Sequence, residues 1–346
     1  MGKMLGSRSS SHQYIVEQAL KLINDNELNI YGSHIMAGAL HEDYFFKPNE
    51  TLENIMLGKE KQLKTLPMTK KELDLMVAGI PMESIVMDRE KGKTLSDGFL
   101  PWIVRRGSEL LRKLGVSQIV DPLNKPYMAH FYNPRKSDKT NQGLVILRGG
   151  LRFESSKKRA EDYWDMALES YGRGELWRAY LCLGHMAHLI EDMCVPAHVH
   201  NDPHGPTLLF GKLDSLEMYM IKPKFIFRPN IRKWKAKDVP KPELTPGWEP
   251  GPFMYRIAYA TQMYRSVDGE GMQLDKGTIK YQFARFNQKY DEKFNSFLDQ
   301  QRTGALSDDE CRFQGCVLIP KAIFHSAELL LQFRQFAKNN PGPVTV

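Results

Sequence analysis

Cysteine is scarce in this chain, because its 346 residues include only four, Cys182, Cys194, Cys311 and Cys316. So few cysteines exclude a small disulfide-stabilised scaffold. Long apolar runs are also missing, since no stretch approaches the roughly eighteen consecutive apolar residues that a membrane-spanning helix needs. The sequence therefore predicts no transmembrane segment.

Strand signals and targeting signals are equally sparse. The N-terminal stretch MGKMLGSRSSSHQYI has no apolar core, so no signal peptide is visible, and its Gly and Ser content predicts a flexible arm over residues 1–11. Only QGLVILRGG and PKFIFRP have the pattern of short strands. We find no internal repeat, which excludes a solenoid.

Helical periodicity dominates the rest of the chain. The stretches SHQYIVEQALKLI, SKKRAEDYWDMALESY and GELWRAYLCLGHMAHLIEDMCV have apolar residues at helical spacing, as does the C-terminal DDECRFQGCVLIPKAIFHSAELLLQF. The sequence thus predicts a mainly α fold, a single multi-helix domain over residues 12–340. Residues 46–127 fit this pattern poorly and are predicted to form an inserted lobe.

Residues 221–252 combine basic and aromatic side chains with several prolines. This composition is a feature of nucleic-acid grooves, but it is more often that of solvated surface loops stiffened by proline. The net charge of +7 favours partners that carry phosphate without identifying one.

The stretch LGHMAHLIEDMCVPAHVHND, residues 183–202, is the most informative part of the sequence. His188 and Asp192 are four residues apart, so on a helix they project from one face and can hold one ion. Pro196 ends that helix, which allows His198 to approach the same point from another backbone direction. His200, Asp202 and His204 follow in a turn-prone segment.

A lone histidine on an apolar helix is usually a satisfied core residue, and we keep this interpretation for His185, His200 and His325 taken alone. Burying an unpaired carboxylate such as Asp192 is costly, however, and a nearby cation is the usual remedy. Nitrogen and carboxylate ligands without thiolate suit zinc, although manganese or iron also fit. The pattern therefore predicts a metal site with more than one ion.

At this point the residues resemble a known family. LGHMAHLIEDMCVPAHVHND is similar to the core signature of the bacterial zinc-dependent phospholipases C, whose fold is shared with secreted zinc nucleases that cut single strands. SHQYIVEQALKLI resembles the opening helix of the family, GALHEDY its segment with a metal-binding Asp followed by Tyr, and AHFYNP its HFYDP turn. The similarity is best over residues 12–44 and 128–220.

The resemblance implies a centre of two or three zinc ions. One zinc would be held by Asp43, His130, His188 and Asp192. His198 would help hold a second zinc, and Asp192 would bridge toward a third that also takes His12. The family completes its second zinc with a His and a Glu four residues apart; here Glu217 is present, the His position is Leu213, and His204 or Asp214 are the candidates to replace it.

The family's third zinc usually also takes the free amino group of a processed N-terminal residue, typically Trp. This chain instead begins with Met1, eleven residues before His12, and has no Trp there. The number of metals therefore stays open between two and three.

The implied activity is hydrolysis of a phosphodiester by metal-activated water, with Asp43 as a general base and with Tyr44 and Phe131 lining the pocket. A phospholipid is the preferred substrate, and Phe225, Phe227 and Trp234 are expected to give the cleft an apolar rim at a membrane surface. A single-stranded nucleic acid is the alternative substrate, with Arg228, Arg232, Lys233, Lys235 and Lys237 as its basic track.

A third interpretation is a metal-binding module without turnover, motivated by Leu213 and by the missing N-terminal Trp. Retention of Asp43, His130, His188, Asp192 and His198 argues against it, because a structural site needs only four ligands. Relatives of the resembled family are typically exported, so the resemblance also implies a secreted or periplasmic protein.

Overall fold

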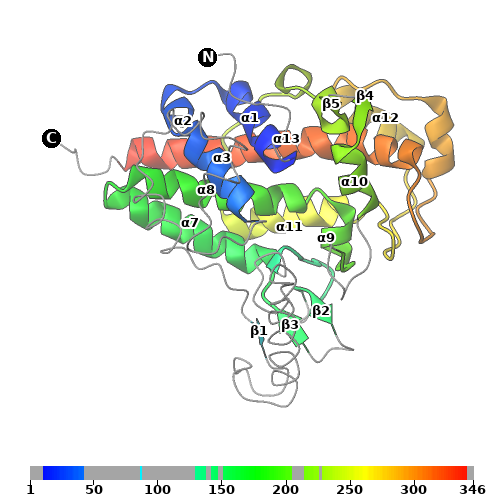
Figure 1. The fold of residues 1–346 in the computed structure, drawn as a ribbon, viewed down its shortest axis with the longest axis horizontal. Coiled ribbons are helices and arrows are strands. Elements are labelled where there is room, and N and C mark those ends of the chain that lie inside the picture. Colours follow the sequence, from blue (N-terminus) through cyan, green and yellow to red (C-terminus); the bar gives the residue numbers. More distant parts are fainter. Residues whose placement is uncertain are drawn as a thin grey trace, which may run out of the picture.

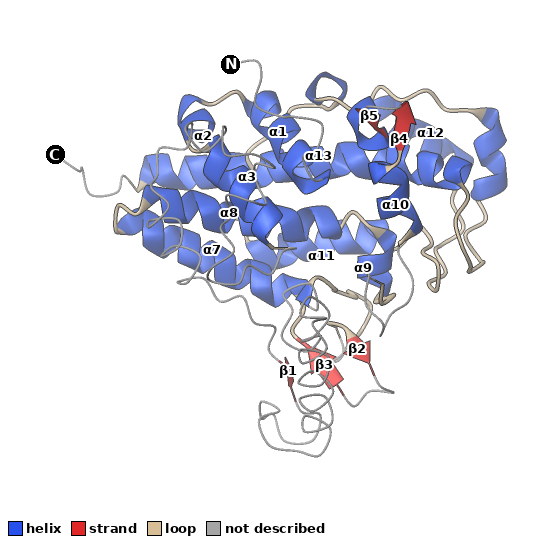
Figure 2. Cartoon of the chain, viewed as in Figure 1, coloured by secondary structure: helices blue, strands red, loops and turns tan. Residues whose placement is uncertain are grey.

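The computed structural model describes residues 11–42, 86–87, 129–137, 142–146, 151–204, 214–225 and 228–340. Within these residues the protein is mainly helical, which confirms the expected fold class (Figure 2). The expected arm, residues 1–11, lies outside this description except for Ser11. The expected lobe, residues 46–127, does so except for Val86–Met87.

The described helices follow the predicted order along the chain (Figure 1). The α-helices are α1 (Ser11–Ile23), α2 (Asn26–Ile30), α3 (Gly32–His41), α7 (Ser156–Gly172), α8 (Leu176–Asp192), α9 (Pro196–His200), α10 (Ser215–Ile221), α11 (Pro250–Thr261), α12 (Lys276–Arg285) and α13 (Asp308–Asn339). Short 3-10 helices are η6 (Asn230–Lys233), η7 (Ala236–Asp238) and η8 (Glu292–Phe297).

Strands are short and antiparallel. β3 (Leu151–Phe153) lies between β1 (Val86–Met87) and β2 (Val145–Ile146), with Val86 opposite Phe153 and Val145 opposite Arg152. β4 (Pro223–Phe225) pairs with β5 (Arg228–Pro229). Both predicted strand stretches therefore contain strands, and the second forms a hairpin.

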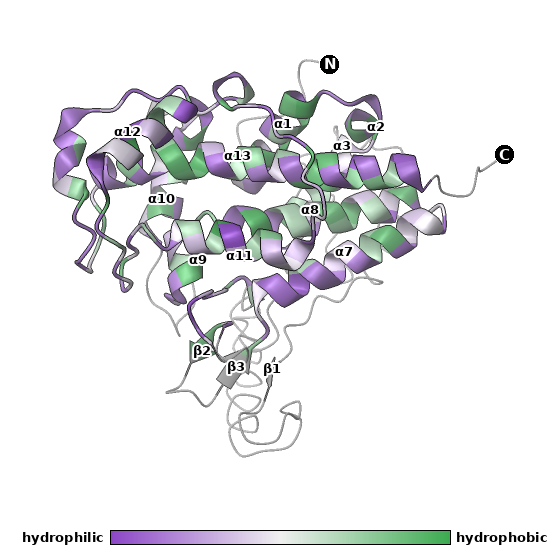
Figure 3. Ribbon diagram, turned by 180° about the vertical axis from the view of Figure 1, so that it is seen from behind, coloured by the Kyte–Doolittle hydropathy of each residue, from purple (hydrophilic) through white to green (hydrophobic). Residues whose placement is uncertain are grey.

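Helix α8 is the central element of the core. All its residues from Ala179 to Asp192 are buried, and it packs against α3, α7 and α13. The helices α7, α8 and α13 run along the long axis of the molecule (Figure 1). Seen from behind, α11 lies beside α7 and α9 (Figure 3). This packing places the C-terminal end of α8, with Asp192, inside the protein.

Two glycines allow α3 and α8 to approach closely. A Cβ atom on Gly38 would lie 2.1 Å from the carbonyl oxygen of Leu181, and one on Gly184 would lie 2.1 Å from that of Ile35. Neither position tolerates a side chain without moving the helix backbones apart. The close contact brings the end of α3 to the level of His188.

Two local signals determine how the chain leaves α8. The helix ends at Asp192, and Pro196 occupies the first turn of α9, where its missing N–H is harmless. Asn201 then ends α9 in the left-handed conformation, with φ of 58°. Pro196 therefore redirects the chain as predicted, and it does so by starting a second helix.

Helix α13 extends over 32 residues and continues through Pro320. Ser307 and Glu310 form a reciprocal capping box at its start. By length and composition α13 could cross a membrane, but 78% of its apolar window is buried inside the protein. Such burial is typical of a core helix that the other helices surround.

The loop predicted over residues 221–252 is fixed to the helical core. Trp234 is only 2% exposed, its carbonyl oxygen accepts a 2.9 Å hydrogen bond from the hydroxyl of Tyr14, and its ring faces Gly315 on α13. The expectation that Trp234 contributes to an exposed rim is therefore wrong. Phe227 and the side chain of Phe225 lie outside the described residues.

Candidate metal centre

Asp192, at the end of α8, is surrounded by four imidazoles. Its Oδ2 lies 3.1 Å from His130 Nδ1 and 3.3 Å from His188 Nε2. Its Oδ1 lies 3.8 Å from Nε2 of His12 and 3.8 Å from Nε2 of His198. These residues come from α1, the segment 129–137, α8 and α9, so the fold gathers distant parts of the chain at one carboxylate.

The electrostatics of this cluster favour an ionised Asp192. Burial raises the pKa of its carboxyl group, but the neighbouring His198, His188 and His130 lower it, and the net pKa is well below the usual value. Burial lowers the pKa of His130, but the charge of Asp192 outweighs it and raises that pKa. The centre is thus a buried anion surrounded by basic nitrogens.

Backbone carbonyls determine the ring tautomers of two of these histidines. Nδ1 of His188 donates a 2.7 Å hydrogen bond to the carbonyl oxygen of Ala39, at the end of α3. Nδ1 of His198 donates a 3.1 Å hydrogen bond to the carbonyl oxygen of His130. Since a carbonyl only accepts, both rings direct Nε2 toward Asp192, which is the arrangement that metal-binding histidines use.

A first group that could hold a metal ion consists of His12, His188 and Asp192. Their ligand atoms all lie within 4.8 Å of one another. The rings of His12 and His188 are stacked, with centroids 3.8 Å apart. Nδ1 of His12 contacts the buried carboxylate of Glu191 at 2.8 Å. Burial raises the pKa of Glu191 to about 7, although His12 acts in the opposite direction.

A second group that could hold a metal ion consists of His198, His204 and Glu217. Oε1 of Glu217 lies 3.1 Å from His198 Nε2 and 3.4 Å from His204 Nε2. Asp214 caps the start of α10 and orders the turn that carries Glu217. His204 and Asp214 were the two candidates to replace the histidine that the resembled family has at the position of Leu213. Of these two, His204 belongs to this group.

The second group is the more accessible of the two, because the side chain of Glu217 is 40% exposed. Burial lowers the pKa of His204, but the carboxylate of Glu217 outweighs it and raises the pKa to about 10. Burial raises the pKa of Glu217, but His204 and His198 lower it by a larger amount, so the pKa of Glu217 lies below its usual value. Histidine and carboxylate therefore stabilise each other's charged forms here.

The residues present fit a divalent metal. Among the described residues, buried Nε2 of His130 and buried Oδ2 of Asp192 have no hydrogen-bond partner, although Oδ2 is close to two poorly aligned imidazoles. Buried polar atoms without partners are costly, and a cation bound between them would remove that cost. Imidazole and carboxylate donors without thiolate suit zinc.

The other predicted site residues have different outcomes. Asp43 and Tyr44 lie outside the described residues. Phe131 is buried, and its ring centroid lies 4.9 Å from that of His198 and 5.6 Å from that of His204. It therefore packs against the second group.

The three histidines interpreted as core residues all have partners within the fold. His185 contacts Glu42, His200 Nε2 donates to the carbonyl oxygen of Tyr264 at 2.8 Å, and His325 contacts Glu328 at 3.1 Å. The sequence-based interpretation of these three residues therefore agrees with the structure.

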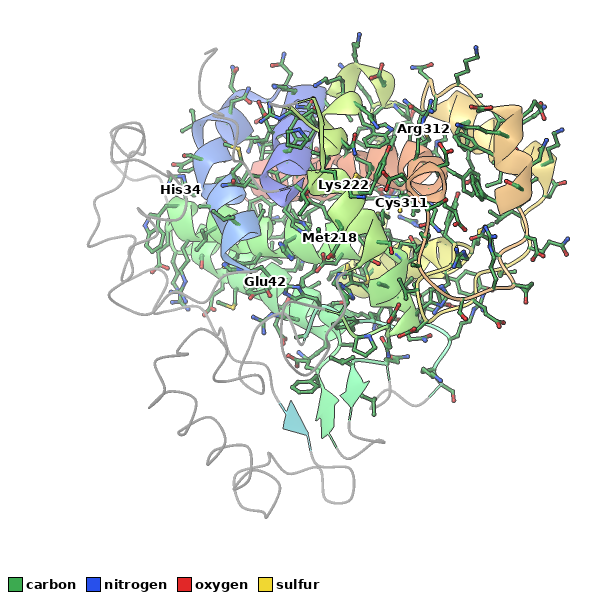
Figure 4. The ribbon with its side chains drawn as sticks, turned by 45° about the vertical axis from the view of Figure 1, so that its right-hand side comes forward. His34, Glu42, Met218, Lys222, Cys311 and Arg312 are labelled. Atoms are coloured by element: carbon green, nitrogen blue, oxygen red, sulfur yellow. The ribbon has the colours of Figure 1, made fainter. Side chains whose placement is uncertain are left out.

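Sequence reasoning missed Glu42, which lies at the end of α3 (Figure 4). Its buried carboxylate accepts hydrogen bonds from Nε of Arg159 at 2.6 Å and from the hydroxyl of Tyr163 at 2.7 Å, and it contacts His185. Oε1 also lies 3.6 Å from His130 Nε2. The available signal was its position directly before Asp43, combined with the basic Arg159 on a helix that packs on α8.

No protein-family model matches this chain, and no curated protein sequence matches it. Among solved structures, the chain is similar to Clostridium perfringens alpha-toxin isolated from avian strain SWCP, with a TM-score of 0.38 and 11% sequence identity. The match covers 99% of this chain and 68% of that chain. A likeness at this level carries no argument about the reaction, so the chemistry rests on the two groups themselves.

Proposed function

We propose that this protein is a metal-dependent phosphodiester hydrolase, and most specifically a phospholipase C. The observation that carries the proposal is the pair of groups that could hold metal ions, His12–His188–Asp192 and His198–His204–Glu217. They lie next to each other, because His198 Nε2 is 3.8 Å from Oδ1 of Asp192. Neighbouring metal ions are the usual arrangement in enzymes that displace groups at phosphorus.

The two groups would hold two zinc ions, and His130 with Asp43 would complete the site or hold a third. When bound, the metals would lower the pKa of a water molecule and neutralise charge on the phosphate oxygens. The chain itself contributes the orientation of the ligands, through the carbonyl oxygens of Ala39 and His130. It also excludes water from the inner part of the centre, since Asp192 and His188 are buried.

Asp43 is proposed as the general base that accepts the proton of the attacking water. Its position in the sequence supports this role. The preceding residue, Glu42, has its carboxylate 3.6 Å from His130 Nε2, so the chain runs beside the centre at this point. Glu42 itself is bound to Arg159 and Tyr163, which leaves the next carboxylate along the chain for this task.

A phospholipid is the preferred substrate, and a single-stranded nucleic acid is the alternative. Stacking of bases requires accessible aromatic rings beside the basic side chains. In the loop 221–252, Trp234 is buried, and the cations of Arg232 and Lys235 lie over the ring of Tyr14, at 5.5 and 5.3 Å. These residues are thus engaged with the core, so the loop lends little support to the nuclease. The burial of Trp234 also removes it from the apolar rim expected for a phospholipid, so the preference for a phospholipid rests on the family resemblance. We also propose that the protein is exported from the cytoplasm, and only the family resemblance supports this part of the proposal.

Metal content measured together with hydrolysis tests this proposal. We expect elemental analysis of the purified protein to give two or three zinc ions per chain. We also expect hydrolysis of a chromogenic phosphocholine ester to exceed that of single-stranded DNA. Replacing Asp192 with Asn should remove at least one zinc, and the rate should fall by more than the roughly 10–100-fold that is typical for loss of an outer-shell partner.

Asp25→Asn is the matched control. Asp25 caps α2 through its side chain, and Asn caps helices equally well, so zinc content and rate should not change. One zinc or none, with both substrates untouched after zinc supplementation, would contradict the hydrolase and leave a metal-binding module without turnover. Preference for DNA would instead favour the nuclease.

A further inference from the structure

Glu191 connects three helices at the edge of the first group. It directly precedes Asp192 on α8 and is 2% exposed. Its Oε2 lies 2.8 Å from Nδ1 of His12 on α1, and its Oε1 accepts a 3.1 Å hydrogen bond from the hydroxyl of Ser326 on α13. Both carboxylate oxygens are therefore used inside the protein.

These contacts have a chemical consequence for His12. When the carboxylate of Glu191 is ionised it only accepts hydrogen bonds, so Nδ1 of His12 then carries the proton of their 2.8 Å contact. The lone pair of the neutral ring is then on Nε2, and this atom lies 3.8 Å from Oδ1 of Asp192. The same tautomer is imposed on His188 and His198 by backbone carbonyls.

His12 needs such a partner because of its place in the fold. It is the second residue of α1, and helix ends fray more readily than helix centres. Glu191 is in the last turn of α8, which is buried from Ala179 onward, and its side chain is itself held by α13. A carboxylate on α8 thus orients a ring at the start of α1.

We propose that Glu191 is a positioning residue that fixes the Nδ1–H tautomer and the orientation of His12, so that its Nε2 can bind a metal ion together with His188 and Asp192. The metal-binding part of this inference rests on the proposed function. The tautomer is a property of the chain alone and can be measured without metal.

The protein contains a matched arrangement away from the centre. Glu328 is also buried, contacts Nδ1 of His325 at 3.1 Å, and accepts hydrogen bonds from the hydroxyl of Thr245 at 3.3 Å and, in addition, from the guanidinium of Arg256 at 3.2 Å. Glu328→Gln therefore removes the charge of a comparable carboxylate paired with histidine, without touching either metal group. This variant controls for the general effect that the loss of a buried carboxylate charge has on zinc affinity.

The experiment uses the full chain with ¹⁵N-labelled histidine, first without metal and then during titration with zinc. At about pH 8, where Glu191 is mostly ionised, we expect the metal-free protein to show His12 protonated on Nδ1 only. In Glu191→Gln, the uncharged amide can either donate to Nδ1 or accept from it, so this signature should weaken in favour of the Nε2–H form. The zinc affinity reported by the rings of His12 and His188 should fall about 10–100-fold. Ser326→Ala should change the tautomer of His12 and the zinc affinity in the same direction but by a smaller amount. Glu328→Gln should change neither of them.

Three results would overturn the proposal: His12 protonated on Nε2 in the metal-free protein, a tautomer that is unchanged in Glu191→Gln, or equal losses of zinc affinity in Glu191→Gln and Glu328→Gln. Failure of the proposed function looks different. It would appear as the absence of zinc binding at both groups of the unchanged protein, whereas zinc bound only by His198, His204 and Glu217 would contradict the role of Glu191 alone.

Discussion

At the scale of single residues, His34 on α3 should make the stability of the protein depend on pH (Figure 4). It is 2% exposed, neither ring nitrogen has a hydrogen-bond partner among the described residues, and burial lowers its pKa to about 4. Above pH 6.5 the ring is neutral in both the folded and the unfolded chain. Below that pH the unfolded chain takes up the proton first, so the free energy of unfolding falls until about pH 4.

The total contribution of His34 is about 3 kcal/mol, from a difference of roughly 2.5 pH units between the two states. Urea unfolding of the protein and of His34→Leu, from pH 7.5 to pH 4, measures it. We expect the difference in stability between the two proteins to change by this amount over the interval. A constant difference would show that His34 is accessible to protons in the folded state.

The buried Glu42 should contribute to stability more than any exposed ion pair. Glu42→Ala removes the carboxylate that Arg159, Tyr163 and His185 share, and loss of one partner from a buried pair costs about 3–5 kcal/mol. Asp162→Ala is the control, because it breaks an exposed contact with Lys158 on the same helix and should cost less than about 1 kcal/mol. Equal midpoints in urea for the two variants would contradict this ranking.

At the scale of secondary-structure elements, the contact between α3 and α8 determines where the metal ligands lie. In Gly184→Ala the new Cβ would meet the carbonyl oxygen of Ile35, so the helices must separate. We expect a loss of about 1–3 kcal/mol in the free energy of unfolding, together with weaker zinc binding, because Ala39 would no longer hold His188. Gly172→Ala, where nothing lies within 4 Å of the added carbon, should be neutral or slightly stabilising. Thermal unfolding and zinc titration of both variants check this.

The elements were also the part of the structure that the sequence predicted best. Apolar periodicity located α1, α7, α8 and α13, and Pro196 marked the change of direction before His198. Spacing on one helix is a local property, so His188 and Asp192 were paired correctly. Trp234 was misplaced because its burial depends on Tyr14 and Gly315, which lie far away in the chain. Glu42 was missed for the same reason, since its partner Arg159 is 117 residues distant.

At the scale of the whole molecule, the centre combines segments that no local pattern connects. His12 and Glu191 are 179 residues apart, and Asp192 receives His130 from a segment that precedes α7. The family resemblance connects His12 and His130 with Asp192, physical reasoning from the residues alone supplied only the part carried by α8 and α9, and the contact of His12 with Glu191 required the structure. The choice of His204 over Asp214 as the partner of Glu217 required the structure, because it depends on a contact between two separate segments of the chain.

The first and last helices also lie against each other, since α1 packs on α13, and Ser326 of α13 holds the carboxylate beside His12. During synthesis, residues 12 and 191 leave the ribosome long before residue 326 does. Helix α1 therefore cannot pack on α13 while most of the chain is being made. Long-range contacts of this kind form late in folding. The order of translation thus makes the hydrogen bond from Ser326 to Glu191, beside the metal centre, one of the last contacts that can form.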